Sequence, residues 1–316
     1  MKEQIISFLK LTILLVGGTV AIMIMLGIAS VPALADSKSL YKMAWGSTLP
    51  KDIASGSLWG RTVGNKINKH QIQIVNAEDG YPVKSGTQSI RFEIREGDCS
   101  HDGNGWSDCK GDRYRSELTS TSKGFKHKFF AWSIYLPDDF KSVDPVLLST
   151  AQIHQHKEGH QHKNGMPKTF AHNMSFHLNN GGYWAVRYLR AYPVENDPYS
   201  GYYKKNTHLI DIKDMLGKWT DIVLEFRSSA NKDGIVKVWV NGELKYDYTG
   251  QTSDGGNNYF KFGLYQSHVS RINNTPPMPW IDGTRKKKSD PYPTQVVYYD
   301  DVRTHGKSFE QVTNPY

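Results

Sequence analysis

Three short stretches of the chain alternate polar and apolar residues without interruption. They are RYRSEL at residues 113–118, AQIHQ at 151–155 and YFKFGLYQ at 259–266. A β-strand sends successive side chains to opposite faces of its sheet, so each stretch predicts a strand with one core face and one polar face. In the third stretch the core face consists of Phe260, Phe262 and Leu264. This pattern restricts the fold to one built from half-buried strands.

The same kind of pattern recurs along the chain and predicts an all-β protein. Strands are expected over residues 89–95, 130–136, 173–178, 183–189, 219–226, 235–244 and 295–303. The sequences NNGG at 179–182 and NG at 241–242 predict tight hairpin turns. One stretch, 209–216, suggests one or two helical turns. Many short strands with turn signals between them predict a β-jelly roll, a concanavalin-like sandwich of two antiparallel sheets with a concave substrate groove.

Residues 1–35 have the features of a secretory signal peptide. A basic start is followed by an uncharged apolar run over residues 11–29 and by a small-x-small cleavage pattern at 33–35. Cleavage before Asp36 predicts a secreted or periplasmic protein with no membrane contact afterwards. The apolar run is also long enough to span a bilayer, so an uncleaved anchor is the alternative. Residues 36–316 contain no linker or repeat, which predicts a single domain and, as the simplest assembly, a monomer.

The charge and aromatic content favour an anionic carbohydrate partner. The formal net charge is +8, and the chain contains 18 tyrosines and 8 tryptophans. Sugar rings stack on aromatic side chains, and basic groups attract anions. Nucleic acid would fit the charge, but the export signal and the lack of a nucleic-acid-binding motif argue against it. An ordinary basic surface is the remaining explanation of the charge.

The two cysteines, Cys99 and Cys109, lie close together in a Gly-rich segment at 97–110. In an exported chain such an isolated pair predicts a disulfide, and two free thiols are the alternative. Two cysteines alone do not make a zinc site, because such sites use about four ligands.

The polar faces of the three alternating stretches carry groups suited to elimination across a uronic acid. The polar face is defined here by eight residues: Arg113, Arg115, Glu117, Gln152, His154, Tyr259, Lys261 and Tyr265. A base must remove the weakly acidic proton at C5, and an acid must protonate the leaving oxygen at C4. The neighbouring carboxylate has to be neutralised by preorganised donors. Arg115 and Gln152 suit that task, because arginine and amide groups donate to carboxylates.

Tyr265 and His154 are the candidates for proton transfer. A phenol must lose its proton to act as a base, and nearby cations such as Lys261 and Arg115 lower its pKa. Where C5–H and C4–O lie on the same side of the sugar ring, one tyrosine can be both base and acid. Where they lie on opposite sides, His154 becomes the base. Glu117 is expected to orient a cation of the same face.

The motifs RSEL at 115–118, QIH at 152–154 and YFKFGLYQ at 259–266 resemble the signature strands of jelly-roll polysaccharide lyases, the alginate, glucuronan and heparin lyase group. The sequences GDC at 97–99, WSIYLP at 132–137 and GKWTDIV at 217–223 are similar to the heparin-lyase-like branch. The resemblance implies Arg115 and Gln152 at the carboxylate, His154 and Tyr265 in proton transfer, and Lys261 in substrate binding. Further substrate contacts are expected from these residues: Arg113, Glu117, Tyr259, Gln266, His177 and Asn173.

The substrate expected first is glucuronan, a 1,4-linked polyuronate, cleaved by β-elimination. Alginate lyases usually have Asn after the catalytic Tyr and Ala or Ser before the Gly of the third motif, whereas this chain has Gln266 and Phe262. This difference weakens alginate as the substrate, although an alginate or heparin-type lyase stays an alternative. A lectin-like sandwich without chemistry is another. A laminarinase-like hydrolase would need paired carboxylates, and no Glu-x-Asp-x-x-Glu strand is present.

The individual residues also have structural explanations. Lys261 and Glu117 could form a cross-strand ion pair, His154 could be a satisfied structural histidine, and Tyr265 could be a packed aromatic. The segment 154–162 contains paired His-x-His units, but its Gly and Lys content predicts a cationic loop beside the groove more than a zinc or copper site.

No cofactor is required for the chemistry. Asp300 resembles the position of a structural calcium ligand, with backbone carbonyls near residue 36 completing the site.

Overall fold

The computed structural model describes residues 59–61, 68–99, 107–120, 124–141, 143, 145–156, 174–179, 182–191, 202–229, 231–253, 257–274 and 292–313. The elements in chain order are β1 (Trp59–Arg61), β2 (Ile72–Asn76), η1 (Ala77–Asp79), β3 (Gln88–Ile94), β4 (Arg113–Ser120), β5 (His127–Tyr135), β6 (Leu147–His156), β7 (Met174–Asn179), β8 (Tyr183–Ala191), β9 (Tyr202–Asp211), η2 (Ile212–Asp214), β10 (Trp219–Arg227), β11 (Gly234–Val240), β12 (Glu243–Gly250), β13 (Asn257–Ser267), α2 (Arg271–Asn274), β14 (Gln295–Gly306) and α3 (Phe309–Thr313). Residues 1–35 lie outside the described part, so the signal peptide stays a prediction.

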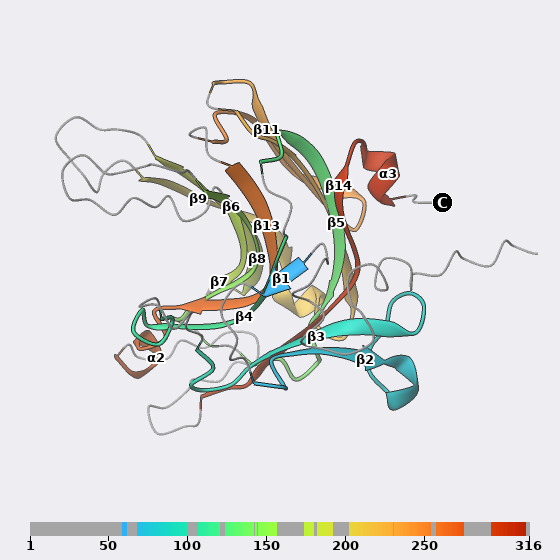
Figure 1. Cartoon of the computed structure of the whole chain (residues 1–316), viewed down its shortest axis with the longest axis vertical. Helices are drawn as coiled ribbons and strands as arrows, with labels where there is room; N and C mark the ends of the chain where they lie inside the picture. The colour runs from blue at the N-terminus through green and yellow to red at the C-terminus, as the bar shows by residue number, and fades with distance from the viewer. Residues whose placement is uncertain are drawn as a thin grey trace, which may run out of the picture. The chain divides into compact units, whose positions relative to one another are not determined.

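The described strands form two antiparallel sheets, which confirms the predicted sandwich. We call the sheet with strand order β1-β4-β13-β6-β7-β8-β9 the front sheet. The back sheet has the order β12-β11-β10-β5-β14-β3-β2. Figure 1 shows both sheets as strongly curved, with the strands of the front sheet bending away from the back sheet. Among the described residues, none of the helices has the length and apolar character needed to cross a membrane.

Aromatic side chains fill the space between the sheets. Phe92 of the back sheet makes an edge-on contact with Phe262 of the front sheet, with 5.5 Å between ring centroids. Trp132 packs in the same way against Phe176 at 5.2 Å. Such edge-to-face pairs add to the free energy that burial supplies. Phe260, Phe262 and Leu264 have no exposed surface, which confirms the predicted core face of β13.

Strand β13 contains a bulge at Gly263, between Lys261 and Tyr265, and this position requires a glycine. The pairing of β13 with β6 shifts register between Phe262 and Tyr265. Gly263 has a φ of 120°, and a Cβ there would collide with the Ser116 carbonyl oxygen and the Phe92 ring. A bulge bends its strand and redirects side chains. Lys261 and Tyr265 are therefore separated by a bend as well as by sequence.

The helical turn predicted within 209–216 is present as η2, which is confined to Ile212–Asp214 because the pairing of β9 with β8 continues to Asp211. The turn predicted at residues 241–242 is confirmed, since Asn241 and Gly242 take φ values of 50° and 83°. The strand expected over 235–244 therefore ends earlier, at Val240.

Candidate active site

The three alternating stretches become adjacent strands of the front sheet. In the pairing of β13 with β4, Tyr265 lies opposite Arg115, and in its pairing with β6, Lys261 lies opposite Gln152 and Tyr259 opposite His154. Residues directly opposite each other point to the same face. The register therefore brings all eight residues of the polar face to one side of the front sheet, away from the core.

Glu117 of β4 is the centre of a hydrogen-bonded cluster on this face. Its Oε2 accepts from Arg115 Nη1 at 2.7 Å and from Lys261 Nζ at 3.3 Å, and its Oε1 accepts from Gln152 Nε2 at 2.6 Å. The Glu117 side chain is only 1% exposed. The ion pair between Lys261 and Glu117 thus exists, and the predicted orienting role of Glu117 has the contacts it needs.

Arg115 is committed to two carboxylates. Its Nε and Nη2 donate to Asp108 Oδ2 at 2.8 Å and Oδ1 at 3.0 Å, while Nη1 donates to Glu117. Burial acts against its charge, but the carboxylates of Glu117 and Asp108 outweigh burial and raise the pKa of Arg115. All three guanidinium nitrogens are engaged. This geometry does not favour the predicted direct contact of Arg115 with a substrate carboxylate.

Tyr265 lies against the face of the Arg115 guanidinium, with 4.3 Å between Cζ and the ring centroid. Burial raises the pKa of Tyr265, and the charges of Arg115 and Arg113 act to lower it. The guanidinium uses its in-plane N–H groups for carboxylates, so its face is left for the aromatic ring. Burial outweighs these two charges, so the pKa of Tyr265 stays above its ordinary value, and the cations reduce the cost of the ionised phenol that proton abstraction needs.

Lys261 is a buried cation within this cluster. Burial lowers its pKa to about 8, the Arg115 charge adds to the lowering, and Glu117 opposes it. Since two carboxylates (Asp108 and Glu117) face two cations (Arg115 and Lys261), the buried cluster is balanced in charge. Arg113 is exposed at the start of β4 and lies outside that balance.

His154 and Tyr259 form a second pair on the polar face. Tyr259 Oη and His154 Nδ1 are 3.0 Å apart, and the two rings stack with 5.1 Å between centroids. Burial raises the pKa of Tyr259 to about 12, and the Glu117 charge adds to the rise. Tyr259 is therefore a neutral phenol near pH 7. Its hydrogen bond fixes the orientation of the His154 ring and engages one of its two nitrogens.

The remaining predicted substrate contacts fall in three different places. His177 of β7 lies opposite Ser149, which in turn lies opposite Tyr265, so it is on the same side as the polar face and buried. Gln266 is a correction, because it has no exposed surface and points to the other side of β13 from Tyr265. There its Oε1 accepts from Tyr292 Oη at 2.6 Å. Asn173 lies outside the described residues.

The predicted disulfide between Cys99 and Cys109 is present. Asp300, the predicted calcium ligand, is fully buried and accepts from the backbone amides of Lys84, Ser85 and Asp301 at 2.8, 3.1 and 2.7 Å. These partners are donors, whereas calcium needs oxygen ligands. The carbonyls near residue 36 lie outside the described residues, so calcium stays a prediction and no step below uses it.

Two residues of the site were missed in the sequence. Asp108 lies in a Gly-rich loop, where no periodicity indicates which way a side chain points. Arg187 of β8 lies opposite Ser175, which lies opposite Gln152, so it is on the same side as the polar face. Its Nε donates to Asn206 Oδ1 at 2.9 Å. The alternation of Trp184 and Val186 with Arg187 was a signal that could have identified it.

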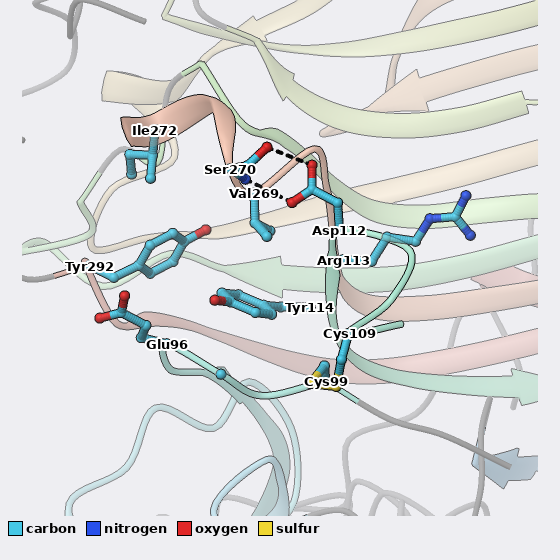
Figure 2. Close-up of a pocket in the computed structure, with 11 residues that line it drawn as sticks. Glu96, Cys99, Cys109, Asp112, Arg113, Tyr114, Val269, Ser270, Ile272 and Tyr292 are labelled. Carbon is cyan, nitrogen blue, oxygen red and sulfur yellow. Dashed lines mark hydrogen bonds between the residues drawn. A yellow bond between two sulfur atoms is a disulfide. The ribbon is translucent and has the colours of Figure 1, made fainter. Parts of the chain in front are cut away.

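A pocket of about 340 Å³ lies beside the start of β4, and Arg113 is the one residue of the polar face that lines it. Figure 2 shows Tyr114 and Tyr292 on one side of it and the disulfide below. Asp112 shapes the rim, because its carboxylate accepts from both the backbone N and the Oγ of Ser270. Tyr114 lies opposite Gln266, the partner of Tyr292, so the two tyrosines lie on the other side of the front sheet from the polar face, and Figure 2 shows the Arg113 side chain pointing away from them.

The comparison with family models identifies the chain. The model of a family described as polysaccharide lyase matches residues 55–303. The chain belongs to this polysaccharide lyase family. No curated protein matches the sequence. The lyase fold is shared with the endo-β-1,4-glucuronan lyase of the fungus Trichoderma reesei, at 18% identity and a TM-score of 0.55, with 80% of this chain and 93% of that chain covered.

Alginate lyases of solved structure are also similar to this lyase. AlgAT5, from polysaccharide lyase family 7, has 15% identity and a TM-score of 0.46, with coverage of 82% of this chain and 99% of that chain. Aly36B in complex with an alginate trisaccharide has 14% identity and a TM-score of 0.42, with coverage of 81% and 92%. The match to the family model confirms the expected family, and the two described sheets confirm the expected fold class. The likeness to the glucuronan lyase, at 18% identity, shows the fold alone.

Proposed function

We propose that this polysaccharide lyase is exported and cleaves a 1,4-linked polyuronate by β-elimination, with glucuronan as its preferred substrate. The observation that carries the proposal is the stacking of Tyr265 on the Arg115 guanidinium, on a sheet face that also presents Arg113, His154 and Lys261. A packed aromatic would not need a buried, doubly paired arginine behind it. The likeness to a glucuronan lyase supports this choice of polymer.

In the proposed reaction the ionised Tyr265 oxygen removes the proton from C5. The electron pair forms the C4=C5 double bond, the C4–O4 bond breaks, and the leaving oxygen takes a proton back from the Tyr265 phenol. Base and acid are the same group, which requires C5–H and C4–O on one side of the ring, as in glucuronate and mannuronate. Tyr265 gains the C5 proton and gives it to the leaving oxygen, so it ends the cycle ionised, as it began.

The substrate carboxylate needs a cation or donor at the moment when charge moves onto it. Arg113 is exposed and lies diagonally across the β4–β13 ladder from Tyr265. Its charge acts to lower the pKa of Tyr265. We assign carboxylate binding to Arg113, on the same face as Gln152 and His154. Arg115 acts through Tyr265 instead, because each of its three guanidinium nitrogens already donates to a carboxylate of the protein.

A direct test is to incubate residues 36–316 with glucuronan, alginate and heparin and to follow the ultraviolet absorbance of the new double bond conjugated to the carboxylate. Glucuronan should give the fastest rise. Tyr265→Phe should lose turnover by at least about 100-fold while retaining polymer binding, since general acid–base groups contribute on that scale. No absorbance rise on any polyuronate would refute the lyase substrate class proposed here.

A further inference from the structure

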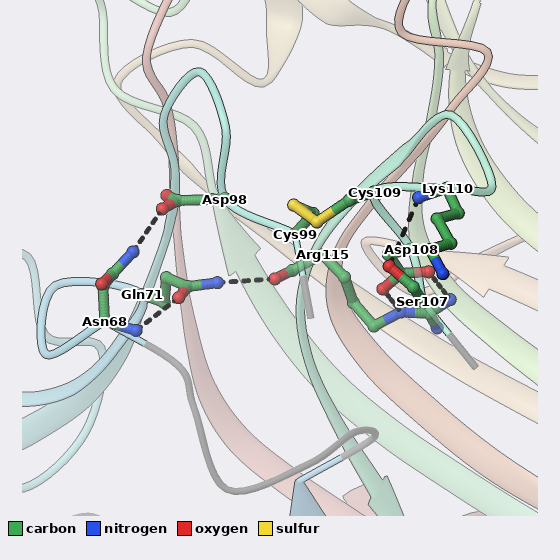
Figure 3. Close-up of a disulfide and its surroundings, with 9 residues drawn as sticks. All are labelled: Asn68, Gln71, Asp98, Cys99, Ser107, Asp108, Cys109, Lys110 and Arg115. Atoms are coloured by element: carbon green, nitrogen blue, oxygen red, sulfur yellow. Dashed lines mark hydrogen bonds and ion pairs between the residues drawn. A yellow bond between two sulfur atoms is a disulfide. The ribbon is translucent and has the colours of Figure 1, made fainter. Parts of the chain in front are cut away.

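The Cys99–Cys109 disulfide lies beside the polar face, and each of its cysteines follows an aspartate. Asp98 precedes Cys99 and Asp108 precedes Cys109. Both aspartates contact Arg115: the Asp98 carbonyl oxygen accepts from the Arg115 backbone N, and the Asp108 carboxylate accepts from the Arg115 side chain, as Figure 3 shows for Asp108. The elimination chemistry gives no task to the disulfide or to Asp108, so their arrangement around Arg115 needs an explanation of its own.

Asp108 holds the Arg115 side chain. Its two carboxylate oxygens accept from Nε and Nη2, at 2.8 and 3.0 Å, in a bidentate arrangement, and its side chain has no exposed surface. A bidentate pair fixes the plane of a guanidinium as well as its position. The plane fixed in this way is the one that presents its face to the Tyr265 ring.

Asp98 holds the Arg115 backbone. Its carbonyl oxygen accepts from Arg115 N at 3.0 Å, and its carboxylate accepts from Arg95 N at 2.7 Å and Asn68 Nδ2 at 2.8 Å. Gln71 Nε2 donates to the Arg115 carbonyl oxygen at 2.8 Å. Together with the disulfide, these contacts form a closed ring that runs from Asp98 through the two sulfurs to Asp108 and back through Arg115.

We propose that Asp108 is a positioning residue that holds Arg115 against Tyr265, and that the Cys99–Cys109 disulfide keeps Asp108 in place for that purpose. The inference rests on the proposed function, because its consequence is read from the turnover of a polyuronate. It assigns the disulfide a role in the chemistry in addition to any effect on folding. Reduction of the disulfide should then lower activity before it unfolds the protein.

The pH profile of kcat distinguishes this role from a structural one. Burial raises the pKa of Tyr265, Arg115 is the leading influence that lowers it, and Asp108 is the weakest of those that raise it. If Asp108→Asn lets Arg115 move away from the Tyr265 ring, the pKa of Tyr265 rises and the acid limb of the profile moves to higher pH. If Arg115 stays without Asp108, the limb moves to lower pH. Opposite directions therefore separate the two cases.

The first experiment compares wild type, Asp108→Asn and Asp112→Asn on glucuronan across the pH range. Asp112 lies in the same turn, pairs with Ser270, and takes a positive φ of 59° that Asn also tolerates, so it is a matched control. We expect Asp108→Asn to move the acid limb up by roughly one pH unit, a tenfold loss of kcat at a fixed lower pH. Asp112→Asn should keep the wild-type profile. An unchanged or lowered limb in Asp108→Asn would overturn the proposal.

The second experiment tests the disulfide with the paired variant Cys99→Ser/Cys109→Ser. Its acid limb should move in the same direction as that of Asp108→Asn, and adding the pair to Asp108→Asn should cause no further movement, since both act through Arg115. A paired variant with the wild-type profile would overturn the role of the disulfide. Thermal unfolding of each variant checks that it is folded. The activity of the wild type on glucuronan tests the proposed function by itself. If the wild type is inactive, the proposed function fails, and this result is known before the Asp108 and cysteine variants are compared.

Discussion

Glu117→Gln is the substitution that tests the charge balance of the polar face most directly. The side chain keeps its shape but loses the negative charge that Arg115 and Lys261 share. Arg115 keeps both bonds to Asp108, so the main loss falls on Lys261, which is left buried without a carboxylate. Removing one partner of a buried ion pair costs about 3–5 kcal/mol, and we expect the lower end here because Lys261 can release its proton.

The loss should depend on pH in a direction that follows from the Lys261 pKa. That pKa is about 8, below the ordinary value of 10.5, so the unfolded chain binds more protons between these values and the Lys261 contribution to stability rises with pH. Without Glu117 the pKa falls further, and each unit adds about 1.4 kcal/mol to the loss below the new value. Above the wild-type pKa both proteins hold a neutral lysine, and this part of the loss disappears.

Urea unfolding followed by tryptophan fluorescence measures the difference. We expect Glu117→Gln to be more destabilising near pH 6 than near pH 9, by at least about 1 kcal/mol. Glu93→Gln is the matched control, because Glu93 is equally buried but pairs with Arg91 and Arg95, which do not titrate in this range. Its destabilisation should be the same at both pH values. An equal or larger loss near pH 9 for Glu117→Gln would refute the assigned pairing of Lys261.

Three further substitutions address the substrate. Arg113→Ala should lower kcat/KM on glucuronan by about 10-fold or more, measured by double-bond absorbance, because a charge-assisted contact to the carboxylate is lost; an unchanged value would assign the carboxylate elsewhere. Tyr259→Phe removes the hydrogen bond to His154 Nδ1 and should change the pH profile of activity. It should also change the preference between sugars that differ at C5, measured on mannuronate- and guluronate-rich alginate. Identical profiles would exclude a positioning role for Tyr259. Arg187→Ala should raise KM with little change in kcat, since Arg187 shares the face of Tyr265 but lies on β8, which β6 and β7 separate from β13.

The sequence was informative wherever the period of a strand determined the result. Alternation in β4, β6 and β13 predicted which side chains share a face, and the register confirmed it for all eight residues of the polar face. The same alternation argued against Gln266 as a partner of Tyr265, because adjacent residues of a strand point to opposite faces. Assigning Gln266 to the substrate followed the resemblance and disregarded that period.

Periodicity could not reveal which partner each polar group would choose. Arg115 was placed correctly, yet its task depends on Asp108, which lies in a loop where side-chain direction follows from turns and a disulfide. Pairing across such a loop is a long-range property, and no local pattern encodes it. The helical turn expected within 209–216 is confined to η2 for a related reason, since ladder bonds to β8 hold the preceding residues in β9.

The two arginines of β4 on the polar face, Arg113 and Arg115, are suited to two different tasks. A cation that binds substrate must have donors free and must be reachable, whereas a cation that sets the pKa of a base works best when it is buried, fixed and insensitive to the substrate. Arg113 is exposed at the start of β4 and fits the first description, and Arg115, with every nitrogen bound to a carboxylate, fits the second. If Arg115 also bound the substrate, each binding event would break the pairing that fixes it against Tyr265. Keeping the two tasks on neighbouring arginines of one strand avoids that conflict, and it explains why β4 places two arginines in the same phase.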